Sequence, residues 1–148
     1  MAVNRGSVQA PVADVLGVLA DASAYPRWVV GPREAIAVDP AWPDPGSGFQ
    51  HETGRGPFTV RDRTQVVRFD RDRGEVVLEA HSGPLGVALV TITVDGQGDR
   101  TVVTLREDAL SGPMRLLPKP VRDAAIHTRN RRAMRRLREM IETGTRAP

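Results

Sequence analysis

Apolar residues recur at helical spacing over residues 121–142, near the end of the 148-residue chain. On a helical wheel of about 100° per residue, one side of this segment carries Ile126, Ala133, Met134, Leu137, Met140 and Ile141. The opposite side carries Arg129, Arg131, Arg132, Arg135, Arg136 and Arg138. An apolar stripe this wide must be buried against another element. We therefore expect a long amphipathic helix that packs across the rest of the protein.

The chain before this helix is typical of short strands separated by turns. Alternation and turn residues predict strands over residues 3–10, 36–39, 48–53, 58–70, 75–81, 87–94 and 100–108. Glycine and proline predict turns at residues 54–57, 82–84 and 95–99. Two short helical segments are expected at residues 11–21 and 26–30. Strands at such short spacing predict an antiparallel meander, with helices near its start and at its end.

Composition indicates an ordinary globular protein, with 40% hydrophobic and 26% charged residues. One domain over residues 1–148 is the expectation for this length. The absence of cysteine excludes disulfides, zinc–thiolate sites and a thiol nucleophile. No segment is long and apolar enough for a transmembrane helix, and the start lacks a secretory signal pattern. We therefore expect a cytoplasmic protein.

The net charge is +3, and Lys119 is the only lysine. Such a preference for arginine indicates the composition of the genome rather than selection for phosphate contacts. We interpret the arginine side of the long helix as a solvated face. Aromatic residues for base stacking are absent from it, so nucleic acid is not an expected partner. An anionic partner for this face stays open.

Several motifs together resemble the START-like superfamily of polyketide cyclase/dehydrase and lipid-transport proteins, also called SRPBCC. The motifs are a strand ending in Ala10-Pro11, a helix followed by Asp21 and Tyr25-Pro26-x-Trp28, and His127-x-x-Asn130 followed by Leu137. The resemblance implies an α+β helix-grip fold. In that fold a curved antiparallel sheet of about six or seven strands wraps around a long C-terminal helix, with two short helices after the first strand. It also implies an apolar cavity between sheet and helix that holds a hydrophobic molecule.

Alternation along the strands and the stripe of the helix nominate the walls of such a cavity. The candidate ligand-binding residues are Trp28, Phe49, His51, Phe58, Leu78, Ala80, Ile92, Leu105, Glu107, Met114, Leu117, Ile126, Asn130 and Met134. For each aliphatic residue in this set, a plain packed core is the alternative interpretation.

Asn130 and Glu107 are the polar residues that most need an explanation. Asn130 interrupts the apolar stripe, and a buried amide without a partner costs about 1–3 kcal/mol. Its partner is either the protein or a ligand. Glu107 shares a strand face with Val103 and Leu105, where burial disfavours a charge unless a cation or donor meets it. Glu107 is therefore either a candidate acid or base, or the partner of an arginine, unless the strand has already ended.

The sequence contains no motif that is typical of a metal site or a cofactor site. His51, His81 and His127 are the only histidines, and their spacing matches no metal motif. We expect no metal and no cofactor.

Two hypotheses follow. In the first, the protein binds a small hydrophobic ligand of lipid-, polyketide- or steroid-like kind. In the alternative, it is a polyketide cyclase or dehydratase in which Glu107, His51 or Asn130 transfers a proton or polarises a carbonyl. The second requires at least two of these side chains to converge. The choice between a monomer and a homodimer stays open.

Overall fold

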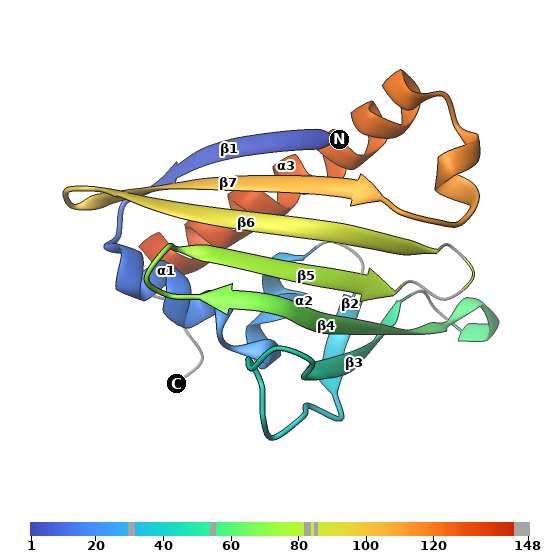
Figure 1. Ribbon diagram of the computed structural model, residues 1–148, viewed down its shortest axis with the longest axis horizontal. Coiled ribbons are helices and arrows are strands. Elements are labelled where there is room, and N and C mark those ends of the chain that lie inside the picture. The colour runs from blue at the N-terminus through green and yellow to red at the C-terminus, as the bar shows by residue number, and fades with distance from the viewer. Residues whose placement is uncertain (30–31, 54–55, 82–83, 85, 144–148) are drawn as a thin grey trace.

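A computed structural model describes the chain except for residues 30–31, 54–55, 82–83, 85 and 144–148. Within the described part, an antiparallel seven-stranded sheet has the order β1-β7-β6-β5-β4-β3-β2 (Figure 1). Its strands are β1 Ala2–Val8, β2 Pro32–Ile36, β3 Gly48–Thr53, β4 Val60–Asp70, β5 Glu75–His81, β6 Val87–Gln97 and β7 Arg100–Ala109. The first strand returns to pair with the last, from Ala2 opposite Glu107 to Val8 opposite Thr101.

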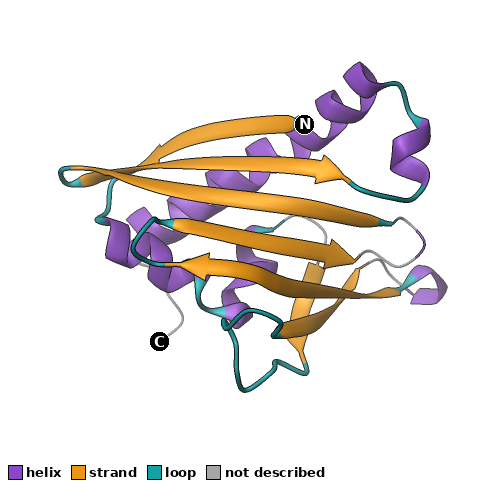
Figure 2. Ribbon diagram, viewed as in Figure 1, coloured by secondary structure: helices purple, strands orange, loops and turns teal. Residues whose placement is uncertain are grey.

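The α-helices of the described chain are α1 Val12–Leu19, α2 Tyr25–Trp28 and α3 Lys119–Glu142. Short 3-10 turns lie at η1 Ala22–Ala24, η2 Gly56–Phe58 and η4 Pro113–Leu116. Figure 2 shows α1, α2 and α3 on one side of the sheet, with α3 extending along the sheet behind β1 and β7. We call the side of the sheet that faces these helices the inner face.

The predicted apolar stripe of the last helix is buried in the structure. The buried residues of α3 are Ile126, Asn130, Ala133, Met134, Leu137, Met140 and Ile141. Those from Ala133 onward belong to one core with inner-face residues such as Ile92 and Val103, and with Leu19 of α1. Burying each such aliphatic side chain stabilises the fold by roughly 1.5–3 kcal/mol. The core therefore lies between the inner face and the helices.

The predicted fold class is confirmed: a seven-stranded antiparallel sheet packs on a long C-terminal helix, with short helices after the first strand. One predicted strand is wrong. We expected a strand at residues 36–39, but β2 covers Pro32–Ile36 and ends there. Ala37 has a φ of 49°, which lies in the left-handed region and interrupts an extended chain.

Several other boundaries differ by a few residues. β4 begins at Val60 rather than at residue 58, because Phe58 belongs to η2. β6 continues to Gln97, so the turn between β6 and β7 is shorter than predicted. That turn has Gly98 at a φ of 70°, a conformation that glycine adopts without strain. The helix predicted at 11–21 ends earlier, and Asp21 instead caps η1 by accepting a hydrogen bond from the Ser23 amide at 3.0 Å. The predicted turns at 54–57 and 82–84, and the end of the segment at 26–30, fall partly outside the described residues.

The helices of the described chain are all too short or too polar to cross a lipid bilayer.

Candidate functional site

The strand register places two of the predicted polar residues, Glu107 and His51, on the inner face of the sheet. Side chains that pair across an antiparallel sheet point to the same face. One row of paired residues runs Glu107, Val90, Leu78 and Val66, and the next runs Ala109, Ala88, Ala80, Thr64 and Phe49. His51 pairs with Asp62 one step further along β3 and β4. Glu107 and His51 therefore share the inner face, with three strands between theirs.

Burial on the inner face decreases toward the end of the sheet where β5 leads into β6. Leu78 and Ile92 are buried, whereas Ala80, Ala88 and Val90 are only partly buried. The side chains in this partly exposed group are small, and two of them are alanine. This end of the inner face is therefore apolar and reached by solvent.

Glu107 and Asn130 form a buried polar cluster between β7 and α3. The Asn130 amide donates from Nδ2 to Glu107 Oε1 at 3.1 Å, and Arg129 pairs with Glu107 Oε2. Glu107 and Asn130 are 6% and 4% exposed, while the side chain of Arg129 is 45% exposed. Both carboxylate oxygens of Glu107 are thus occupied by protein groups. Among the alternatives left open by the sequence, Asn130 has a protein partner and Glu107 pairs with an arginine.

A second buried polar cluster contains His51, Asp62 and Thr64 on β3 and β4. His51 Nε2 lies 3.1 Å from Thr64 Oγ1, within hydrogen-bond distance. His51 Nδ1 lies 3.8 Å from Asp62 Oδ2, too far for a hydrogen bond, and has no hydrogen-bond partner among the described residues. Burial lowers the pKa of His51, and the negative charge of Asp62 opposes that shift only in part. The imidazole is therefore neutral near pH 7, with Nδ1 free to bond a ligand.

Aromatic rings connect this histidine to the second helix. The ring of Phe49 lies 5.7 Å from that of His51 and 5.2 Å from that of Tyr25, and Tyr25 lies 5.1 Å from Trp28. Tyr25 donates from its hydroxyl to the Leu19 carbonyl at 3.0 Å. Trp28 Nε1, in contrast, is buried without a hydrogen-bond partner among the described residues. Two buried polar atoms, Trp28 Nε1 and His51 Nδ1, therefore lie at the two ends of one row of rings.

The other predicted wall residues divide by exposure. Buried side chains are those of Trp28, Phe49, Leu78, Ile92, Leu105, Ile126 and Met134. Ala80 and Met114 are partly buried, whereas Leu117 and Phe58 are 39% and 82% exposed. The structure thus brings most of the set to the inner side of the sheet, and leaves Phe58 and Leu117 facing solvent.

Sequence reasoning missed two residues of this site, Asp62 and Thr64. Both alternate with the buried Val66 along β4, so period-2 alternation could have assigned them to the inner face. Within the described residues, no group of three histidine, aspartate, glutamate or cysteine side chains is arranged to hold a metal ion.

No protein-family model and no curated protein matches the chain. Solved structures do resemble it. The di-domain ARO/CYC StfQ from the steffimycin biosynthetic pathway superposes with a TM-score of 0.72 at 16% identity, over 98% of this chain and 46% of that one. The di-domain ARO/CYC BexL from the BE-7585A biosynthetic pathway superposes with a TM-score of 0.74 at 16% identity, over 99% of this chain and 47% of that one. CV1439 from Chromobacterium violaceum superposes with a TM-score of 0.70 at 11% identity, over 96% of this chain and 99% of that one.

These similarities define the architecture of the protein. The chain spans just under half the length of the two di-domain proteins and nearly all of CV1439. It has the helix-grip fold, in agreement with the resemblance of its sequence motifs to the START-like superfamily.

Proposed function

We propose that the protein binds a small hydrophobic molecule with oxygen-bearing groups, of lipid-, polyketide- or steroid-like kind, between the inner face and α3. The observation that carries this proposal is that two buried polar atoms, Trp28 Nε1 and His51 Nδ1, have no hydrogen-bond partner in the described part of the chain. A buried polar atom without a hydrogen bond costs about 1–3 kcal/mol, so such atoms are rare and need an explanation. A ligand carbonyl or hydroxyl group would supply the missing partner.

The surroundings of these atoms favour an apolar ligand body. Ala80, Ala88 and Val90 form a partly exposed apolar surface on the same face of the sheet. Covering apolar surface stabilises a complex by roughly 25 cal/mol per Å². Two of the similar structures carry the description ARO/CYC, so polyketide-like compounds belong in the set of molecules to be tested.

Binding can be measured with the protein's own fluorescence. The chain has two tryptophans, and Trp42→Phe leaves Trp28 as the only one. We expect at least one member of a panel of fatty acids, steroids and aromatic polyketides to change Trp28 emission and raise the melting temperature. Ala88→Leu fills the inner face and should weaken that response. Thr91→Leu, on the opposite face of the same strand, is the matched control.

Two results would overturn the proposal. In the first, no member of the panel changes either signal. In the second, Ala88→Leu and Thr91→Leu weaken binding equally, which would mean that the ligand does not lie on the inner face.

A second candidate function is a cyclase or dehydratase activity on a polyketide-like substrate. The observation that favours it is the convergence of Asn130 and Glu107 at 3.1 Å, on the face that also carries His51. Because both Glu107 oxygens are occupied, His51 is the best suited of the three to exchange a proton with a substrate. Mass spectrometry of incubated substrates distinguishes the two functions. An enzyme yields a cyclised or dehydrated product that His51→Gln reduces, whereas a binding protein returns its ligand unchanged.

A further inference from the structure

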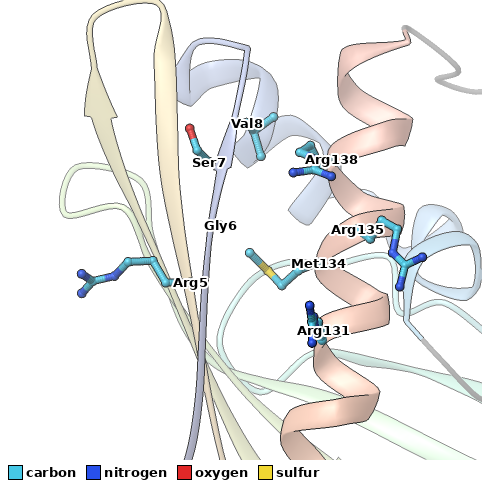
Figure 3. Close-up of a pocket in the computed structure, with 8 residues that line it drawn as sticks. All are labelled: Arg5, Gly6, Ser7, Val8, Arg131, Met134, Arg135 and Arg138. Atoms are coloured by element: carbon cyan, nitrogen blue, oxygen red, sulfur yellow. The ribbon is translucent and has the colours of Figure 1, made fainter.

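A groove lies between edge strand β1 and helix α3, at the margin of the inner face, because Gly6 pairs with the inner-face residue Val103. Its volume is about 480 Å³. The residues that line it are Arg5, Gly6, Ser7, Val8, Arg131, Met134, Arg135 and Arg138 (Figure 3). The sequence predicted a solvated arginine face and left an anionic partner open, but it did not predict a groove, because a helical wheel does not reveal that β1 lies beside the helix.

The ends of the groove are closed by contacts between helix and strand. At one end, His127 Nδ1 lies 3.2 Å from the Val3 carbonyl oxygen, and Asn4 Nδ2 donates to the His127 carbonyl at 3.0 Å. At the other end, the Gln9 amide donates to Glu142 Oε1 at 2.9 Å. The strand and helix therefore run side by side from residue 3 to 9 and from 127 to 142.

Gly6 lies between the two ends and lets the helix approach. A Cβ atom at Gly6 would lie 2.9 Å from Met134 Cε, closer than such atoms come in proteins. The Val3 carbonyl and the Gln9 amide both bond away from the sheet. Because backbone groups alternate in direction along an antiparallel edge strand, the polar backbone groups of Arg5 and Ser7 face the same way. The groove therefore adds backbone donors to its side chains.

The charge of the groove is strongly positive. Four of the eight residues that line it are arginines, and none of the described lining residues is acidic. Among the described residues, none of these four arginines has an ion pair, whereas Arg129 and Lys119 of the same helix pair with Glu107 and Asp123. Figure 3 shows Arg131 and Arg138 on the side of α3 toward β1, and Arg5 leaving the far side of β1. Like charges on the groove side of α3 repel one another, and an anion beside them would relieve that repulsion.

We propose that this groove binds a small polyanion, a compact molecule with two or more phosphate groups. The planar guanidinium group suits phosphate oxygens, because it donates two parallel hydrogen bonds to them. The volume falls within the range of small-molecule sites, and the closed ends suit a compact ligand better than a nucleic acid that must pass through. None of the described residues that line the groove is an aromatic residue that could stack on a base. This proposal does not rest on the function proposed for the inner face.

Isothermal titration calorimetry with orthophosphate, pyrophosphate and tripolyphosphate tests the proposal. We expect saturable binding that tightens with the number of phosphates and weakens as salt rises. The double substitution Arg131→Gln/Arg138→Gln should weaken tripolyphosphate binding at least about tenfold, because it removes the two guanidinium groups on the groove side of α3 and their charge-assisted hydrogen bonds to phosphate. The matched control is Arg132→Gln/Arg136→Gln, which removes the same charge from exposed positions outside the groove. It should change the affinity less than about threefold, because these two side chains do not line the groove and attract the ligand only at long range, where salt screens the charge.

The comparison of the two pairs decides the outcome. Equal weakening by both would show diffuse attraction to the helix surface and overturn the site, as would the absence of saturable binding. Tighter binding to duplex DNA or anionic vesicles, weakened equally by both pairs, would also overturn it in favour of an extended charged surface. If the groove pair does not fold by circular dichroism, the single substitution Arg138→Gln replaces it, with Arg136→Gln as its control.

Discussion

Asn130 of α3 donates a hydrogen bond to Glu107 of β7 at 3.1 Å, and both residues are buried. Asn130 is the only polar residue among the buried positions of α3, so the one interruption of the apolar stripe is a direct link from helix to sheet. Arg129, one residue earlier, pairs with the other Glu107 oxygen. Adjacent residues of the helix thus satisfy both oxygens of one buried carboxylate.

This link predicts strong coupling between Asn130 and Glu107. Asn130→Leu leaves a buried carboxylate oxygen without its partner, and we expect the free energy of unfolding to fall by about 1–3 kcal/mol. Replacing both residues with leucine should cost less than the sum of the single changes, because no polar atom of the pair is then left unpaired. Urea unfolding of the two single variants and the double variant measures the coupling. Additivity within about 0.5 kcal/mol would show that the bond does not stabilise the fold.

His51 predicts a dependence of stability on pH. Burial lowers the folded-state pKa of His51 below its ordinary value of 6.5, so the unfolded state binds the proton more readily. The contribution of a neutral His51 to the free energy of unfolding is fully present above about pH 6.5. It is lost as the pH falls toward the folded-state pKa. His51→Gln should therefore flatten the decline in stability between about pH 7.5 and pH 5.

Urea midpoints across this range test the prediction. His81→Gln is the comparison, since the side chain of His81 is 41% exposed and its removal leaves the burial of His51 unchanged. If His51→Gln leaves the slope of stability against pH as it is in the unmodified protein, His51 does not titrate as the structure implies.

Leu137 tests the packing of α3 on the sheet. It is 1% exposed, and Leu137→Ala removes methyl groups from a closed interior. We expect a loss of about 2–5 kcal/mol in the free energy of unfolding. Arg136→Ala, at the exposed neighbouring position, should change stability by less than about 0.5 kcal/mol. Thermal or urea unfolding compares the two, and a similar small effect of both would mean that α3 is not packed on the core.

Alanine substitutions at Gly74 and Gly98 distinguish the cost of a steric clash from the cost of a left-handed backbone conformation. Both have a positive φ, of 64° and 70°. A Cβ at Gly74 would lie 2.4 Å from the Val94 carbonyl oxygen, whereas a Cβ at Gly98 would meet no atom within 4 Å. Gly98→Ala should therefore cost only the left-handed conformation, about 1–2 kcal/mol, and Gly74→Ala should cost clearly more. Equal losses in melting experiments would show that the β4–β5 turn moves freely away from Val94.

Local patterns account for what the sequence predicted well. The buried face of α3 follows from helical spacing, and the inner faces of the strands follow from alternation, because both depend only on neighbouring residues. The N-terminal motifs added the topology, since they resemble a superfamily with that fold. The strand expected at residues 36–39 failed because the left-handed conformation of Ala37 is not apparent from hydrophobic alternation.

The sequence by itself determined most of the side chains that are buried, although Phe58 and Leu117 proved exposed, and it identified Glu107, His51 and Asn130 as polar residues that would need partners. Only the tertiary structure decided what those partners are. Glu107 contacts Arg129 and Asn130, which lie 22 and 23 positions later in the chain. His51 of β3 contacts Thr64 of the neighbouring strand β4. The arginine groove exists because β1 lies along α3, through contacts between residues more than 120 positions apart in the chain. Periodicity determines the direction of a side chain within its own element, whereas contacts between distant elements depend on how the whole sheet and helix pack.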